Sequence, residues 1–220
     1  MTIPRPRGLV IFDIDGTLFQ TDTATIPAVQ QSFTAFGLEP PAFEEVTAFM
    51  GRPDGEIHAW LERRVGERWR DLARVMADAE MEMVSVTGRL YAGVPELLAA
   101  LRPRAEQLGI CSNGPEDYVT TVLAAKDLAR FFDAVRWRQQ GDATKTEMVR
   151  DLLNALRARP AVLVGDRHDD VEAAHANGIP VIGAAYGYGR AGKLDEADLR
   201  TTSADQLLSA IDELLRRDPL

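Results

Sequence analysis

The chain has 220 residues and a formal net charge of −9, with 45% of its residues hydrophobic and 27% charged. This acidic balance argues against a nucleic-acid-binding surface, and no apolar stretch is long enough for a membrane span. A single cysteine, Cys111, excludes an internal disulfide framework, so we expect a cytoplasmic protein whose core needs no covalent staple.

The first predicted element is a buried strand over Leu9–Phe12, which ends in two carboxylates, Asp13 and Asp15. Unpaired charge is costly to bury, so a core strand has no structural use for two acids at its tip. Open α/β sheets bind their ligands beyond the carboxyl ends of their strands. The pair therefore indicates a cation site, a nucleophile or both; the alternative is an acidic loop that only caps the strand.

Residues 21–90 are predicted to be mostly helical, because their apolar residues recur at a 3.6-residue spacing and no segment resembles a strand. A turn cluster, Gly51–Gly55, divides this block. Arg52 in that turn could reach over a crevice to a substrate, or it could be a surface arginine.

From Gly93 onward, predicted strands alternate with predicted helices, which indicates a parallel sheet with helices on both faces. The strands are expected at residues 107–111, 134–137, 161–164 and 179–182, and the helices at residues 94–101, 118–125, 145–157, 171–177 and 204–215. The predicted fold is therefore an α/β, doubly wound, Rossmann-like core (residues 1–20 and 91–220) with an inserted α-helical domain (residues 21–90).

Polar residues recur directly after the predicted strands. Ser112 and Asn113 follow the second strand, and Asp166 and Asp170 follow the fourth. Each cluster alone could be a turn or a helix cap. Because parallel strands end at the same edge of a sheet, we expect these residues to share one crevice with Asp13 and Asp15.

Lys145 begins a predicted helix, where a cation is not favoured electrostatically. Only three of the 25 basic residues are lysines, so a lysine here could indicate that a compact ammonium is required. The alternative is a solvated lysine at a helix start.

These residue types fit one chemistry. Hard oxygen ligands without a Cys or His cluster favour Mg²⁺ over zinc. Asp13 could attack phosphorus and form an acyl-phosphate, while Asp15 could protonate the leaving alcohol and then activate water. Ser112, the Asn113 backbone and Lys145 are the expected partners of the phosphoryl oxygens, with Thr17 and Arg52 as further candidates.

Four segments, in order, resemble the motifs of the haloacid dehalogenase-like hydrolase superfamily: Asp13–Thr17, Ser112–Gly114, Lys145 and Gly165–Asp170. The helical insertion resembles the small cap domain of the phosphoglycolate-phosphatase-like branch. The segment Gly183–Gly189 resembles a segment that is common in the same branch. The resemblance implies Mg²⁺ held by Asp13, the Asp15 carbonyl, Asp166 and Asp170. Its spacing from Asp166 favours Asp170 over Asp169 as the residue beside the metal. We expect Asp169 to be solvated or to cap the following helix.

The presence of Asp15 argues against a dehalogenase, which needs no leaving-group acid. We therefore expect a Mg²⁺-dependent phosphatase, a phosphoric monoester hydrolase acting on a small phosphorylated metabolite as a monomer or homodimer. A phosphosugar mutase or a pyrophosphatase using the same residues is the alternative within the superfamily. A non-catalytic domain that accepts a phosphoryl group on Asp13 is the alternative from another class.

Overall fold

The computed structural model describes residues 8–49, 54–139, 141, 144–189, 192 and 194–216. The chain forms two compact units. One consists of Met1–Phe19 and Leu90–Leu220, and the other of Gln20–Arg89. Within the described residues, no helix has both the length and the apolar character that crossing a membrane requires.

The larger unit is built on a six-stranded sheet in which every neighbouring pair is parallel. Its strands lie in the order β5-β4-β1-β6-β7-β8. They are β1 (Leu9–Phe12), β4 (Gln107–Ser112), β5 (Ala134–Trp137), β6 (Ala161–Gly165), β7 (Val181–Ala184) and β8 (Leu199–Thr201). The chain adds strands on one side of β1 and then on the other, which is the doubly wound arrangement predicted from the sequence. The predicted fold class is confirmed.

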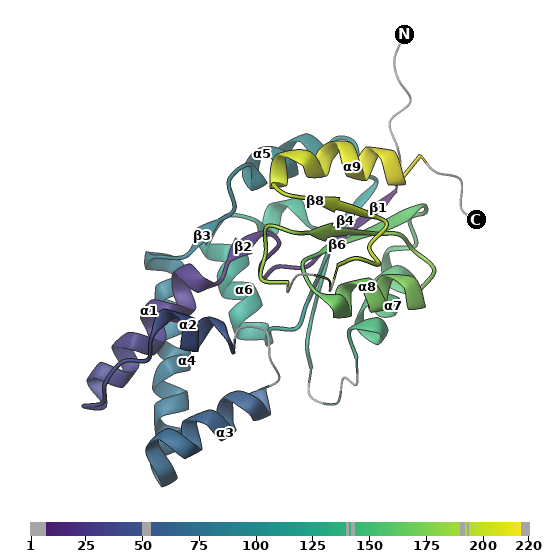
Figure 1. The fold of residues 1–220 in the computed structure, drawn as a ribbon. Coiled ribbons are helices and arrows are strands. Elements are labelled where there is room, and N and C mark those ends of the chain that lie inside the picture. Colours follow the sequence, from purple (N-terminus) through teal and green to yellow (C-terminus); the bar gives the residue numbers. More distant parts are fainter. Residues whose placement is uncertain are drawn as a thin grey trace. The chain divides into compact units, whose positions relative to one another are not determined.

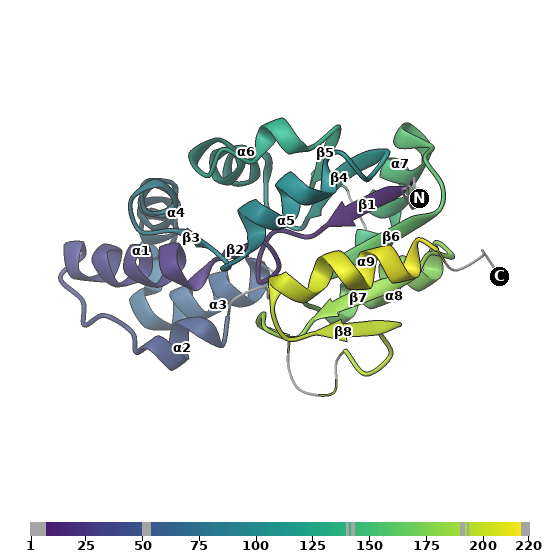
Figure 2. The same cartoon turned by 90° about the horizontal axis from the view of Figure 1, so that it is seen from above.

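Helices cover both faces of this sheet, and they are α5 (Val94–Leu101), α6 (Glu116–Ala125), α7 (Lys145–Leu156), α8 (His168–Ala176) and α9 (Leu207–Leu214). In Figure 1, α5 and α9 lie on one side of the sheet and α7 and α8 on the other. Seen from above in Figure 2, β1 runs between β4 and β6.

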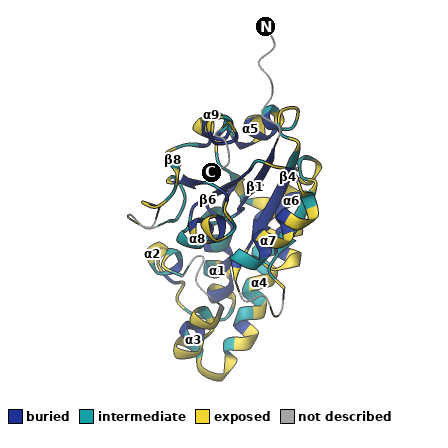
Figure 3. Ribbon diagram, turned by 90° about the vertical axis from the view of Figure 1, so that its right-hand side faces the viewer, coloured by how far each residue is buried: buried dark blue, intermediate teal, exposed yellow. Residues whose placement is uncertain are grey.

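The buried core of this unit follows from its strand composition. Strand β1 is completely buried, and the helices place apolar residues against both faces of the sheet while their outer faces are exposed (Figure 3). One cluster joins Leu9, Ile11, Leu163 and Val181 of the sheet to apolar residues of α7 and α8. Strands buried on both faces read as continuous apolar runs, which is why β1 could be located from the sequence.

The smaller unit is helical and has its own core. Its helices are α1 (Asp22–Ala35), α2 (Phe43–Thr47), α3 (Asp54–Val65) and α4 (Trp69–Val86). Phe33, Leu61 and Leu72 are almost fully buried at its centre, beside Trp60. The indole N–H of Trp60 and the Arg64 guanidinium both donate to Glu45, at 2.9 and 2.5 Å, which ties α3 to α2.

Some elements differ from the sequence-based expectation. A two-stranded sheet of β2 (Phe19–Gln20) and β3 (Arg89–Leu90), strand β8 and helix α2 were not predicted, and β7 begins at Val181 rather than residue 179. The expectation that residues 21–90 contain no strand is therefore wrong at β3. The 3₁₀ helices at Gly66–Arg68, Ala129–Phe131 and Ala204–Gln206 were not predicted either. All these elements except β7 are too short to show a hydrophobic period.

Candidate active site

Three adjacent strands, β1, β4 and β6, carry the predicted site residues at their carboxyl ends. Strand β1 pairs with β4 on one side and β6 on the other, and the Asp13 amide extends the pairing by donating to the Val164 carbonyl at 2.9 Å. The direction of chain winding reverses at β1, which is where sheets of this kind form their ligand crevice. The sheet topology thus brings together segments that are more than a hundred residues apart in sequence.

Three carboxylates converge at these strand ends. Each of Asp13, Asp166 and Asp170 offers an oxygen, and these three atoms all lie within 4.8 Å of one another. All three residues are buried. Like charges at this separation repel strongly in a low-dielectric interior, so the cluster requires positive charge or protons to be stable.

Lys145 supplies one such charge. Its Nζ lies 2.7 Å from Asp13 Oδ1 and 2.5 Å from Asp170 Oδ1, and the residue is only 5% exposed. Lys145 is the first residue of α7, so its unusual position at a helix start is explained by the two carboxylates that it contacts. Burial alone would lower the pKa of Lys145, but Asp13 and Asp170 raise it well above its usual value, so the side chain is an ammonium.

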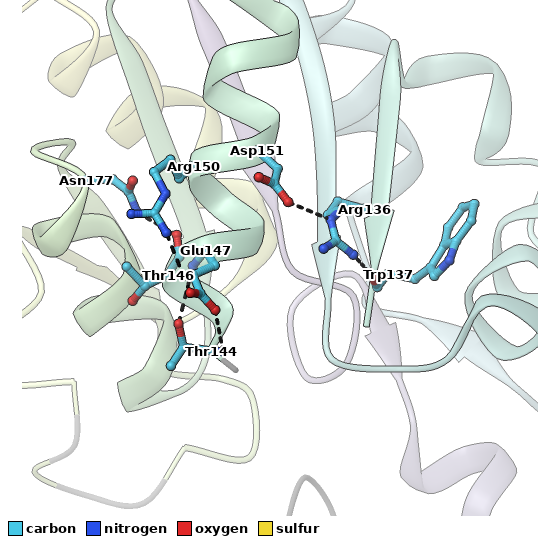
Figure 4. A network of polar contacts seen from close by, with 8 residues as sticks. All are labelled: Arg136, Trp137, Thr144, Thr146, Glu147, Arg150, Asp151 and Asn177. Carbon is cyan, nitrogen blue, oxygen red and sulfur yellow. Dashed lines mark hydrogen bonds and ion pairs between the residues drawn. The ribbon is translucent and has the colours of Figure 1, made fainter. Parts of the chain in front are cut away.

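The start of α7 is fixed by contacts on both sides of Lys145 (Figure 4). Thr144 and Glu147 form a reciprocal capping box, in which each side chain accepts from the other's backbone N–H. The Asn177 side chain donates to the Thr146 carbonyl at 2.9 Å. These contacts hold the first turn of α7 to the end of α8, and thereby fix the base of the Lys145 side chain.

Asp166 is oriented by the loop that follows β7. The Tyr188 amide donates to Asp166 Oδ2 at 2.7 Å, while Asp166 Oδ1 is buried without a hydrogen-bond partner in the described part of the chain. The loop approaches so closely that a Cβ on Gly187 would lie 2.5 Å from the Asp166 Cβ and would also collide with the Gly16 carbonyl oxygen. A glycine is therefore required at position 187.

Asp170 and Asp169 have different surroundings. Asp170 Oδ2 accepts from the Arg167 amide at 3.0 Å, and Asp170 Oδ1 faces Lys145. Asp169 is half-buried and accepts from the Asn113 amide group at 2.7 Å. The expectation that Asp169 is solvated or caps α8 is thus wrong, because its side chain joins α8 to the loop after β4.

Asp15 is held by a residue that the sequence did not single out. The Tyr118 hydroxyl, in the first turn of α6, donates to Asp15 Oδ1 at 2.5 Å. Nothing in the sequence distinguishes Tyr118 from an ordinary core aromatic residue of a helix, since its contact arises only when β1 and β4 are adjacent. The contact of the Tyr188 amide with Asp166 also could not be assigned from the sequence, because it depends on how the loop after β7 folds back over Asp166.

The predicted phosphate-binding residues differ in burial and in their hydrogen-bond partners. Ser112 and Thr17 are fully buried; Ser112 Oγ accepts from the Gly114 amide at 3.1 Å, and Thr17 Oγ1 has no hydrogen-bond partner among the described residues. Asn113 is exposed, and its carbonyl oxygen accepts from Arg138 at 2.5 Å. Arg52 lies outside the described residues.

Burial dominates the acid–base behaviour of the carboxylate cluster. It raises the pKa of Asp13 to about 7; Lys145 lowers that pKa, while Asp166 and Asp15 raise it. Burial and then Asp170 raise the pKa of Asp166 to about 7, and burial also raises the pKa of Asp170 to about 7. One ammonium is thus too little positive charge for three buried carboxylates, which is the electrostatic condition of a cation site.

Comparison with known proteins identifies the family. The haloacid dehalogenase-like hydrolase family matches residues 10–184. A phosphoglycolate phosphatase of Photorhabdus laumondii is 29% identical over 213 residues, which cover 92% of this chain and 91% of the relative. A 5′-nucleotidase of Pseudomonas aeruginosa is 29% identical over 192 residues, covering 82% of this chain and 83% of the relative.

Solved structures agree in fold. The crystal structure of a predicted phosphoglycolate phosphatase from Haemophilus somnus superimposes with a TM-score of 0.83 at 21% identity, covering 94% of this chain and 98% of the other. The chain belongs to the haloacid dehalogenase-like hydrolase family. This result confirms the family predicted from the sequence, and the relatives support the predicted enzyme class, a phosphatase of that family.

Proposed function

We propose that this protein is a Mg²⁺-dependent phosphatase that hydrolyses a small phosphate monoester through a phosphoaspartate on Asp13. The observation that carries the proposal is the convergence of Asp13, Asp166 and Asp170 around one side of the site, with Lys145 as the counter-charge. The family and the similarity to a phosphoglycolate phosphatase and a 5′-nucleotidase support the same class of substrate.

The donor set fits a hard divalent cation. All three converging side chains offer carboxylate oxygens, and Asp166 Oδ1 is a buried acceptor with no partner among the described residues. Oxygen ligands of this kind suit Mg²⁺ rather than zinc. We assign Asp13, Asp166 and Asp170 and the Asp15 carbonyl as the residues that would hold it. A bound Mg²⁺ would neutralise part of the substrate's charge in a pocket that otherwise repels a phosphate dianion.

Asp13 is the proposed nucleophile. A carboxylate oxygen of Asp13 attacks phosphorus, and the bond from phosphorus to the leaving oxygen breaks. Lys145, at 2.7 Å from Asp13 Oδ1, stabilises the ionised form of Asp13 that this step requires. Ser112 can donate its hydroxyl hydrogen to a phosphoryl oxygen, because its oxygen already accepts from the Gly114 amide. Thr17, Asn113, Lys145 and Arg52 are the further proposed phosphate contacts.

Asp15 is the proposed acid and base. In the first step it gives a proton to the leaving alkoxide, which departs as the alcohol. In the second step it takes a proton from a water molecule that attacks phosphorus, and the bond between phosphorus and Asp13 breaks to release inorganic phosphate. Asp13 is thereby regenerated and Asp15 is protonated again, so the cycle balances.

We assign the helical unit, residues 21–90 in the sequence-based division, the role of a cap. Specificity for the organic part of the substrate and exclusion of bulk water are the functions that such an insertion serves. The proposed substrate class is a small phosphorylated metabolite, consistent with the two relatives named above.

A panel of phosphate monoesters assayed with Mg²⁺ and then with a chelator tests the proposal. We expect inorganic phosphate to be released in a Mg²⁺-dependent manner, and Asp13→Asn to abolish this release while the protein remains folded. Conversion of a sugar phosphate into its isomer without release of phosphate would favour a mutase instead. Substantial phosphatase activity in Asp13→Asn would overturn the assignment.

A further inference from the structure

We propose that Tyr118 is the positioning residue of the acid/base, orienting the Asp15 carboxylate through its hydroxyl; this inference rests on the proposed function. The hydroxyl donates to Asp15 Oδ1 at 2.5 Å. The two residues are 103 positions apart and come from different strand ends, so only the folded sheet brings them together. The resemblance to the family assigns no role to this tyrosine.

The ring of Tyr118 is held firmly. The residue is 4% exposed and lies in the first turn of α6, which begins directly after the loop that follows Ser112. A Cβ on Gly114 would lie 2.8 Å from Cδ1 of the tyrosine ring. The ring therefore occupies the space left by the missing side chain of Gly114, and a buried ring with two torsions has little freedom to move away.

A carboxylate that transfers protons must be aligned with the leaving oxygen at hydrogen-bond distance. Asp15 is only half-buried, so packing alone does not restrict its side chain as it restricts Asp166 or Asp170. The hydrogen bond from the buried Tyr118 hydroxyl is a restraint of that kind. Because Oδ1 can accept this hydrogen bond while the other oxygen carries the proton, the hydroxyl restrains Asp15 both as the acid and as the base.

The same segment thus serves two sides of the reaction. Ser112 at the end of β4 is available to the phosphoryl oxygens, and Tyr118 in the first turn of the next helix orients the group that handles the leaving-group proton. Gly114 lies between them in sequence; its amide donates to the Ser112 hydroxyl oxygen and its bare Cα accommodates the Tyr118 ring.

A structural explanation also exists, because a buried tyrosine hydroxyl needs some partner. The experiment separates the structural role of Tyr118 from its positioning role by comparing substrates whose leaving groups differ. Phenyl phosphate has a poor leaving group and needs protonation by Asp15, whereas p-nitrophenyl phosphate has a good one and needs it little. The value of kcat/KM reports the step in which the leaving group departs.

We expect Tyr118→Phe to lower kcat/KM on the order of tenfold for phenyl phosphate, and markedly less for p-nitrophenyl phosphate. Tyr186→Phe is the matched control, because the Tyr186 hydroxyl donates to the Thr17 carbonyl at 2.9 Å and not to Asp15. This control is expected to change kcat/KM for both substrates by the same factor. Circular dichroism and thermal unfolding verify that both variants fold.

An equal fall for both substrates in Tyr118→Phe, or no fall for either, would overturn the inference. Asp13→Asn, measured alongside, separates this outcome from a failure of the proposed function. If Asp13→Asn is inactive and Tyr118→Phe shows no selective loss, only the role of Tyr118 is wrong. If Asp13→Asn hydrolyses both substrates as the unaltered protein does, the proposed function is wrong and the role of Tyr118 with it.

Discussion

Lys145 places its ammonium 2.7 Å from the Asp13 carboxylate, although 132 positions separate the two residues in the chain. The same Nζ lies 2.5 Å from Asp170 Oδ1, so a single buried cation at the start of α7 links the end of β1 to the first turn of α8. The site is thus an electrostatic unit in which each charged group depends on the others.

Replacement of Lys145 by Met tests this dependence. Without the ammonium, the pKa of Asp13 and of Asp170 would rise further, and less of Asp13 would be ionised at neutral pH. We expect kcat/KM to fall about 10²- to 10³-fold, comparable to the loss of a group that stabilises transition-state charge. Steady-state kinetics with p-nitrophenyl phosphate measure this effect.

Lys126→Met is the control for that change, because Lys126 follows α6 as its C-cap and is not among the side chains around Asp13. We expect it to retain near-normal activity. If Lys145→Met were as active as Lys126→Met, the ion pair between Lys145 and Asp13 would have no part in catalysis.

The metal-free protein is expected to lose stability as the pH rises from about 4 to about 7. Asp13, Asp166 and Asp170 have pKa values raised from 3.8 to about 7, so the folded state binds more protons than the unfolded state in this window. The three carboxyl groups contribute fully to the free energy of unfolding when the pH is below their pKa in the unfolded state. This contribution is lost as the pH rises through their pKa in the folded state. Thermal unfolding in a chelator at pH 5 and pH 8 measures this difference.

Added Mg²⁺ should reverse the loss, because binding requires the ionised carboxylates. We expect Mg²⁺ to raise Tm more at pH 8 than at pH 5, by about 2–4 °C for each kcal/mol of binding linkage. Asp166→Asn should weaken both the pH dependence and the Mg²⁺ response, whereas Asp127→Asn on the surface should preserve them. A Tm shift with Mg²⁺ that is unchanged in Asp166→Asn would argue against this metal site.

Gly187→Ala tests the loop that orients Asp166. The added Cβ would lie 2.5 Å from the Asp166 Cβ and collide with the Gly16 carbonyl oxygen, so the loop or Asp166 must shift. We expect a smaller Mg²⁺-induced rise in Tm and at least a tenfold loss of activity, because small misplacements of catalytic groups are costly. Gly55→Ala in α3 is the control: a Cβ added there would meet no atom within 4 Å, and alanine favours a helix. An unaltered Mg²⁺ response in Gly187→Ala would contradict the proposed restraint.

Phe33→Ala tests the core of the helical unit. Phe33 is fully buried and its ring lies 5.6 Å from that of Trp60. Truncation of a buried phenylalanine costs about 3–5 kcal/mol. Chemical denaturation should show this loss, while Phe43→Ala, at a residue that is 52% exposed, should change the unfolding free energy by less than about 0.5 kcal/mol. Equal effects of the two substitutions would show that the core is wrongly located.

The sequence was most informative where burial dominates. The continuous apolar run of β1 predicted a central strand, and the helix at Val94–Leu101 was predicted with its observed bounds. Strand β8 was missed because its three residues, Leu199–Thr201, alternate in burial at the edge of the sheet and are too few to show a period.

The site residues likewise include some that the sequence predicted and some that it did not. Asp13, Asp166 and Asp170 could be placed together because they follow parallel strands. Lys145 was assigned to the site through its resemblance to the third motif of the family, and its electrostatically unusual position at a helix start only favoured that assignment. The contacts of Tyr118 with Asp15 and of the Tyr188 amide with Asp166 could not be predicted. These two contacts depend on how closely the chain packs at Gly114 and Gly187, and a sequence pattern does not predict such close packing.

The most direct measurement is a burst experiment on Asp15→Asn with p-nitrophenyl phosphate and Mg²⁺. This good leaving group departs without an acid, but the following hydrolysis lacks its base, so we predict one equivalent of nitrophenolate per enzyme and a phosphoryl group on Asp13 by peptide mass spectrometry. The absence of a burst, or a phosphoryl group on another residue, would contradict the nucleophilic role of Asp13.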